Sequence, residues 1–136
     1  METNEFQTEW CLLQNQFDSY EKHSLYIKLL SVIILLMVEI FSSASIVILV
    51  ILLTLWVQDA IWKTFQSRIE SRLLQIEKFI AEGSHQAVCQ FNSEFMKVRL
   101  TGLSLMKEYA RQAIRPTVAF PHIVLILILL AHYILS

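Results

Sequence analysis

The sequence predicts an all-α integral membrane protein that forms a single domain over residues 1–136. Apolar residues make up 55 % of the chain and charged residues only 17 %, whereas soluble domains average about 45–50 % and about 25 %. Two glycines and two prolines are too few to punctuate a β protein. The stretch 25–62 is almost continuously apolar, which is typical of membrane-spanning segments. We therefore expect a transmembrane helical hairpin, a cytosolic antiparallel helical hairpin and a C-terminal third transmembrane helix.

Residues 5–24 are predicted to form a short amphipathic helix that leads into the membrane. Apolar side chains recur along it at intervals of three and four, at Phe6, Trp10, Leu13, Phe17 and Tyr20. The opposite face is polar and acidic, and anionic lipid repels an acidic face. Of two placements, on the bilayer surface or against the protein's own cytosolic helices, we favour the second.

The apolar stretch 25–62 divides into two short spans, 25–41 and 45–62. As one straight helix it would extend about 57 Å, nearly twice the ~30 Å of a hydrocarbon core. The small residues Ser42-Ser43-Ala44-Ser45 offer a turn between the spans. The alternative is one tilted span that continues as a long helix into water. We favour the hairpin because exposing the uncharged segment Ile46–Trp56 to water would be costly.

Residues 63–115 are predicted to form cytosolic helices that pair as an antiparallel hairpin around Gly83, a typical C-cap residue. In residues 63–82, charged residues alternate with an apolar stripe of Phe65, Ile69, Leu73, Ile76 and Ile80. The second helix, 84–115, carries a heptad pattern typical of coiled coils. This pattern predicts an oligomer or partner seam made of Val88, Phe91, Phe95, Val98, Gly102, Leu105 and Tyr109.

The third span is predicted at 118–136. Pro116 stops the preceding helix, and Pro121 suits the first turn of the next one. Basic residues gather at one end of all three spans, at Lys22, Lys28, Lys63, Arg68, Arg72, Arg111 and Arg115. The positive-inside rule then makes the N-terminus and residues 63–117 cytosolic and places the C-terminus outside. We expect the bacterial inner membrane as the location.

Polar residues within the spans are the most informative, because such groups are costly in a membrane and are usually functional. Lys28 and Glu39 lie three helical turns apart and therefore share one face of the first span. They form either a polar stripe facing a pore or another helix, or two groups that snorkel to opposite interfaces. The candidate pore-lining or interface-lining residues are Lys28, Ser31, Glu39, Ser42, Thr54 and Gln58.

The remaining candidates for chemistry are few. His122 and His132 point to different faces of the third span, so we interpret them as interfacial anchors rather than as a proton relay. His85 and Cys89 have i, i+4 spacing, but nothing nearby completes a metal site. No nucleophile or phosphate-binding motif occurs. The sequence therefore predicts neither an enzyme nor a cofactor.

Basic residues of the cytosolic region are interspersed with acidic ones, as on a solvated helix face. Arg111 and Arg115 are different, because they lie one turn apart beside the third span and suit lipid headgroup phosphates. The formal net charge of −1 provides no basic footprint for nucleic acid. The predicted partners are the lipid bilayer, further copies of this chain and a cytosolic protein.

A tight apolar hairpin over 25–62 followed by the charged helix 63–82 resembles the SLATT-type small transmembrane effectors of bacterial defence systems. The resemblance implies an oligomer that opens or damages the membrane when it is triggered. A lone three-span chain of 15.9 kDa cannot enclose an aqueous path, so we predict a homo-oligomeric pore, ion channel or membrane-perturbing effector. The alternative is a non-catalytic accessory or scaffold subunit that docks a cytosolic partner through residues 63–115.

Overall fold

The computed structural model describes residues 2–41, 45–83 and 89–135, and the described residues contain helices and no strands. The helices are α1 (Glu2–Phe41), α2 (Ile46–Glu82), α3 (Phe91–Lys97), α4 (Leu103–Ile114) and α5 (Pro116–Leu135). The all-α prediction is therefore confirmed. Three of the helices, α1, α2 and α5, are long and apolar enough to cross a membrane.

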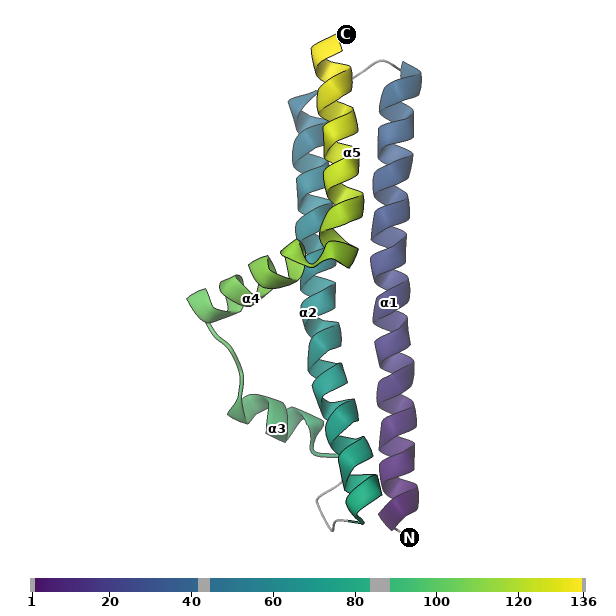
Figure 1. Cartoon of the computed structure of the whole chain (residues 1–136), viewed down its shortest axis with the longest axis vertical. Coiled ribbons are helices and arrows are strands. Elements are labelled where there is room, and N and C mark those ends of the chain that lie inside the picture. Colours follow the sequence, from purple (N-terminus) through teal and green to yellow (C-terminus); the bar gives the residue numbers. More distant parts are fainter. Residues whose placement is uncertain (1, 42–44, 84–88, 136) are drawn as a thin grey trace.

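Helices α1 and α2 lie side by side and run in opposite directions (Figure 1). Each is longer than the segments predicted from the sequence, because no break occurs between residues 24 and 25 or between 62 and 63. Neither helix contains a glycine or proline that would interrupt its backbone hydrogen bonds. Helix α1 ends at Phe41 and α2 begins at Ile46, so the described residues form two helices where the alternative predicted one continuous helix over 25–62.

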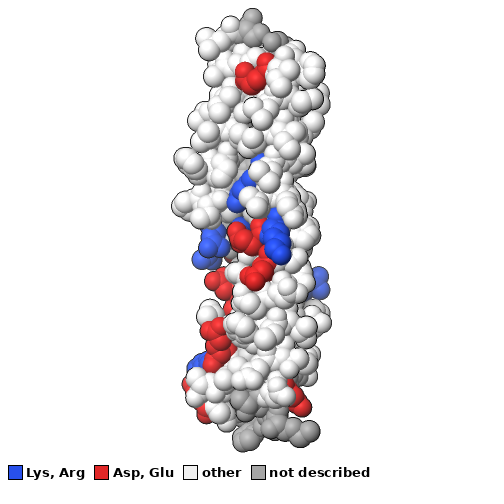
Figure 2. Space-filling model, turned by 90° about the vertical axis from the view of Figure 1, so that its right-hand side faces the viewer, with Lys and Arg blue, Asp and Glu red and all other residues white. Residues whose placement is uncertain are grey.

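Helix α5 packs against α1 and α2 at the end of the molecule that holds the α1–α2 connection and the C-terminus (Figure 1). The buried core there is aliphatic and consists of Leu35, Val38, Leu52, Leu125 and Leu129. We call this part the apolar half: residues 28–41 and 46–59, with α5. Its outer surface is also apolar, and one side shows no Lys or Arg over most of its length and an acidic patch near the end (Figure 2).

The remainder is the polar half: residues 4–27 and 60–83, with α3 and α4. Here the apolar stripe of α1 packs on α2, as expected, with the Phe6 and Phe79 rings 6.0 Å apart and those of Tyr20 and Trp62 5.3 Å apart. The stripe predicted over 63–82 also faces inward, because Ile69, Leu73 and Ile76 are buried. At Gly83, α2 ends in a left-handed residue whose N–H bonds the Phe79 carbonyl, which confirms the predicted C-cap.

The prediction of one continuous helix over 84–115 is wrong. The described part of this region forms two separate helices, α3 and α4, with non-helical residues 98–102 between them. Gly102 has φ +56° and ψ −130°, a backbone conformation that residues with a side chain avoid. The residues with heptad spacing belong to two short helices. Helix α4 packs on α2, and α3 contacts α2 through Phe95, whose ring centre lies 4.6 Å from the guanidinium carbon of Arg68.

The start of the third apolar helix also differs from the prediction. Pro116 begins α5 instead of only ending the preceding helix, and Pro121 lies inside α5. The break falls at Arg115, whose ψ of 134° is extended. Pro116 then occupies the first helical position, where its missing N–H costs nothing and its fixed φ suits the helix.

Candidate polar cluster at the junction of three helices

A group of polar side chains from three helices meets where the two halves join. Asp59 of α2 is fully buried. Its Oδ1 accepts a hydrogen bond from the Ser24 hydroxyl of α1, and its Oδ2 lies 3.2 Å from Nε2 of His122 on α5. Lys28 Nζ of α1 is 3.7 Å from the same Oδ2. We call Ser24, Lys28, Asp59 and His122 the Asp59 cluster.

The cluster satisfies the requirement that a buried charge be paired and hydrogen-bonded. Ser24 and His122 are as fully buried as Asp59, while Lys28 remains partly exposed. The His122 ring is stacked on Trp56, with centroids 6.2 Å apart and planes 12° apart. Trp56 in turn donates its indole N–H to the Ala113 carbonyl over 3.1 Å. The cluster therefore fixes α1, α2, α5 and the end of α4 relative to one another.

Two sequence-based interpretations change at this cluster. His122 is not an anchor at the membrane surface, because its side chain is buried and faces Asp59. Lys28 does not simply snorkel away from the helices, because it pairs with Asp59 on the neighbouring helix. Ser24 and Asp59 were not predicted as members from the sequence. The turn predicted at 42–45 would place Lys28 and Asp59 opposite each other in an antiparallel pair, and this register was the available signal.

The other predicted lining residues do not join the cluster. Ser31 is fully buried and donates to the Ile27 carbonyl of its own helix, whereas Thr54 is exposed and donates to the Val50 carbonyl. Gln58 is half-buried. Glu39 lies near the other end of the apolar half, with its Oε2 3.2 Å from Nδ1 of His132. Ser42 lies outside the described residues, so the described candidates form separate contacts rather than one polar path.

A second set of polar contacts ties α1 to α2 in the polar half. Arg72 donates from Nε to Glu9 Oε1 over 2.9 Å, and both side chains are almost completely buried. The other Glu9 oxygen accepts the backbone N–H of Cys89 at 2.7 Å. Closer to the junction, Lys63 Nζ lies 2.6 Å from Glu21 Oε2, and the Gln66 amide donates to the same oxygen. These hydrogen bonds, and the positive charge of Lys63, lower the pKa of Glu21 below its ordinary value.

The residues of the predicted seam line a groove instead of a coiled-coil face. Phe91, Phe95, Leu105 and Tyr109 are half-buried, Val98 is exposed, and Val88 lies outside the described residues. Two adjoining cavities of about 190 and 280 Å³ lie between α2 and the segment that carries α3 and α4. We call this the α2–α3–α4 groove, lined by Thr64, Ser67, Arg68, Ser71, Arg72, Gln75, Phe91, Glu94, Phe95, Val98, Leu100, Leu105 and Glu108.

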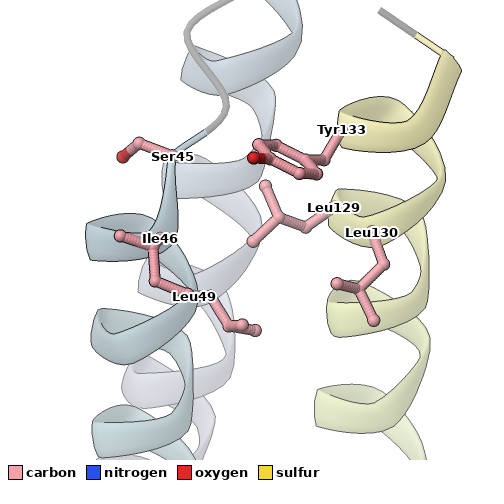
Figure 3. Close-up of a pocket in the computed structure, with 6 residues that line it drawn as sticks. All are labelled: Ser45, Ile46, Leu49, Leu129, Leu130 and Tyr133. Carbon is pink, nitrogen blue, oxygen red and sulfur yellow. The ribbon is translucent and has the colours of Figure 1, made fainter.

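One further crevice, of about 130 Å³, lies at the far end of the apolar half (Figure 3). Leu49 of α2 and Leu129 of α5 point toward one another across it, below Tyr133 (Figure 3). No charged side chain lines this crevice. Within residues 2–41, 45–83 and 89–135, no group of three His, Cys, Asp or Glu side chains gathers in a metal-binding arrangement. The i, i+4 pair of His85 and Cys89 cannot be compared with the structure, because His85 lies outside these ranges.

Comparisons with known proteins add no family to this geometry: no family model, no curated protein and no solved structure matches the chain. The Asp59 cluster, the outer surface of the apolar half and the α2–α3–α4 groove are therefore the features that bear on function.

Proposed function

We propose that this chain is a non-catalytic, membrane-anchored accessory or scaffold subunit. In this proposal α1, α2 and α5 cross the bilayer, with α1 and α2 forming a transmembrane hairpin, and the polar half extends into the cytosol. Helix α5 would extend about 30 Å, which matches the thickness of a hydrocarbon core. The orientation is supported by the absence of any Lys or Arg from residues 29–62 and 116–136 of the sequence.

The α2–α3–α4 groove is the surface we assign to a cytosolic partner, and Arg68 is the observation that carries this assignment. Its guanidinium carbon lies 4.8 Å from the centre of the Phe65 ring and 4.6 Å from that of Phe95. Within the described residues no carboxylate is paired with Arg68. An aromatic-flanked guanidinium in a groove with both apolar and polar lining suits a partner that supplies both an apolar surface and a carboxylate.

The partner we infer is therefore an amphipathic helix with an acidic residue on the edge of its apolar face. The floor of the groove, on α2, supplies hydroxyls, Gln75 and the guanidinium groups of Arg68 and Arg72. The α3–α4 segment supplies apolar side chains together with Glu94 and Glu108. Val98 and Leu100 at the rim are exposed. Such a groove matches the helix-in-groove mode of peptide recognition, in which apolar anchors recur every three or four residues.

A homo-oligomeric pore, the function implied by the resemblance to SLATT-type effectors, receives less support from the geometry. Most of the described polar groups of the spans are used in contacts within the chain, with Ser31 and Asp59 fully buried. The outward faces of these helices carry mainly Leu, Ile, Val and Met. A pore lined by such faces would be hydrophobic and would be prone to dewetting. We therefore rank the pore second.

The direct test is site-specific photocrosslinking of the full chain in its native membrane. A photoreactive benzoylphenylalanine replaces Val98 at the groove, and a matched variant carries it at Leu74, which is also exposed on the polar half but does not line the groove. We expect one discrete crosslinked protein at Val98, lost from the Arg68→Glu variant, and no such product at Leu74. Mass spectrometry of the product identifies the partner and the helix that it contributes.

Two results would overturn the proposal in different ways. Crosslinks at Val98 that contain only this chain would show that the groove mediates self-association. Ion flux through liposomes that hold the purified protein alone would establish the pore instead. A membrane that remains sealed, together with a foreign crosslinked partner, is the outcome that supports a subunit.

A further inference from the structure

Helix α4 has two distinct faces, and only one of them is used within the chain. Toward α2 it presents half-buried residues, including Leu105 and Tyr109, and the buried Gln112. On the other side three large apolar side chains project into open space: Leu103 is 85 % exposed, Met106 66 % and Ile114 74 %. With the exposed Ala110 they are spaced at three and four residues and form one continuous strip.

The strip faces the apolar half of the molecule. Leu105 and Glu108 line the cavity that α4 shares with residues 64–71 of α2, and this cavity lies on the side of α4 away from the apolar half. At about 100° per residue, Leu103 and Ile114 lie roughly opposite Leu105 and Glu108 around the helix. The strip therefore faces in the direction in which α5 extends from its junction with α4.

Basic residues flank the strip along one side. Lys107, Arg111 and Arg115 follow one another at intervals of four residues, and all three are exposed. Arg111 lies 3.7 Å from Glu108, with its own side chain 79 % exposed, and Arg115 donates to the Gln112 side chain over 3.1 Å. An exposed apolar strip bordered by Lys and Arg is the pattern of helices that lie in a membrane interface, where basic side chains extend to the headgroups.

The position of α4 agrees with this pattern. It lies across the long axis of the α1–α2–α5 bundle, at the level where the apolar half begins (Figure 1). Only Arg115 separates it from α5, and the Trp56 indole holds its last turn at the Ala113 carbonyl. Its apolar strip is continuous with the exposed surface of α5, where Phe120 is 71 % exposed.

We infer that α4 lies in the plane of the cytosolic membrane interface, with its apolar strip among the acyl chains and Lys107, Arg111 and Arg115 against the phosphates of anionic phospholipid. The inference rests on the membrane insertion that forms part of the proposed function, but not on partner docking, because the groove uses the opposite face of α4. Lys107 thereby joins Arg111 and Arg115, which were predicted from the sequence to bind lipid headgroups. This placement of α4 also explains why Leu103 and Ile114 are apolar although none of the described residues covers them.

The test measures membrane depth with nitroxide spin labels on the full chain, in a background with Cys11→Ser and Cys89→Ser. Single cysteines replace Met106 on the strip, Leu36 on the outer face of α1 and Ser71 on the polar half. The protein is reconstituted in vesicles of phosphatidylcholine, or of phosphatidylcholine and phosphatidylglycerol in a three-to-one ratio. Collision with oxygen reports acyl-chain depth, and collision with a water-soluble nickel chelate reports exposure to water.

We expect the Met106→Cys label to collide with oxygen about as often as the Leu36→Cys label and the Ser71→Cys label to collide mainly with nickel. An aqueous label at position 106 with a deep label at position 36 would overturn the inference and leave membrane insertion intact. Aqueous labels at both positions would instead overturn the insertion itself.

The preference of α4 for anionic lipid is tested by a triple variant, the charge variant, which combines Lys107→Gln, Arg111→Gln and Arg115→Gln. Its matched control, Lys78→Gln with Lys97→Gln and Arg99→Gln, removes the same charge from the rest of the polar half. We expect phosphatidylglycerol to increase the depth of the position 106 label in the parent and control proteins but not in the charge variant. Equal depth in both vesicle types for all three proteins would overturn the recognition of anionic phosphate.

Discussion

The two halves of the α1–α2 pair are joined by different kinds of contact, although each helix runs through both halves without a break. The apolar half packs Leu35, Val38 and Leu52 against α5, and among the described residues its polar contacts between helices lie at the two ends. The polar half combines a buried apolar stripe with ion pairs such as Glu9–Arg72. The difference follows from the proposed surroundings of each half, because water drives apolar burial and lipid does not.

This comparison assigns a role to the polar contacts in each half. In the polar half, Ile69, Leu73 and Ile76 supply the driving force for association, and the ion pairs specify the register of α1 on α2. If the apolar half crosses the bilayer as proposed, its helices gain little by leaving lipid, so close packing and the Asp59 cluster must hold them together. Four experiments test whether the two halves differ in this way.

The largest expected effect is that of Arg72→Ala in the polar half. The substitution leaves the buried Glu9 carboxylate with the Cys89 N–H as its remaining described partner. Breaking one side of a buried ion pair typically costs about 3–5 kcal/mol. We expect a loss of that size in the free energy of unfolding, measured by denaturant titration in detergent micelles with Trp10 as the fluorescent reporter.

The matched control for this variant is Lys78→Ala, which removes an exposed pair whose Nζ lies 3.8 Å from Glu82 Oε1. An exposed pair contributes about 0–1 kcal/mol. Equal effects of Arg72→Ala and Lys78→Ala would contradict the assignment of Glu9–Arg72 as a specific buried contact. The double variant Glu9→Leu with Arg72→Met should recover most of the loss, because it leaves no buried charge unpaired.

The next expected effect compares Ile76→Ala with Leu52→Ala. Both side chains are almost completely buried, Ile76 in the polar half and Leu52 in the apolar half. In water, truncation of a core Ile costs about 2–5 kcal/mol, because transfer and cavity terms add. In lipid the transfer term nearly vanishes, since acyl chains are as apolar as Leu. We expect Leu52→Ala to cost clearly less than Ile76→Ala in SDS titrations of the protein in bicelles, and equal costs would place both halves in the same solvent.

A smaller effect is expected from Asp59→Asn at the junction. The amide keeps its capacity for hydrogen bonds to Ser24 and His122 but loses the charge that attracts Lys28. Polar contacts between membrane helices contribute about 1–2 kcal/mol at most in model systems. We expect a loss in this range and a change in Trp56 fluorescence, because Trp56 stacks on His122. Glu39→Gln at the exposed far end is the control. An equal loss of stability in Glu39→Gln would contradict a specific role of Asp59 in joining the helices.

Much of the architecture was predictable from the sequence, because apolar periodicity directly reflects burial on a helix. The stripes on 5–24 and 63–82 were found this way, and the C-cap at Gly83 was predicted from the glycine itself. The break between α3 and α4 was not, because a heptad pattern persists across residues 98–102 whether or not the backbone is helical. Gly102 was assigned to the seam, although its conformational freedom also allows a break.

The polar cluster was only half predictable. Lys28 stood out as a charge in an apolar segment, but its partner could be found only from the register of α1 against α2. Asp59 lies between Trp56 and Trp62. An acidic residue beside tryptophans at a membrane interface is explained by its contact with water, so nothing in the sequence indicated that Asp59 is buried. His122 required the placement of α5, which depends on packing between helices far apart in the sequence.

The smallest predicted effect is the pH dependence that Glu21 contributes to the polar half. Hydrogen bonds from Lys63 and Gln66, with the charges of Lys63 and Lys28, lower the pKa of Glu21 in the folded protein below its ordinary value of 4.5. The unfolded chain therefore takes up a proton first as the pH falls, so the stabilisation is complete above pH 4.5 and is lost as the pH falls through the lower, folded pKa. Because the Glu21 side chain is 60 % exposed, we expect a contribution below about 1 kcal/mol. Comparing the free energy of unfolding between neutral and acidic pH for the parent, Glu21→Gln and the exposed control Glu5→Gln measures it. A parent and a Glu21→Gln variant with the same pH dependence would show that the Lys63 contact does not persist in solution.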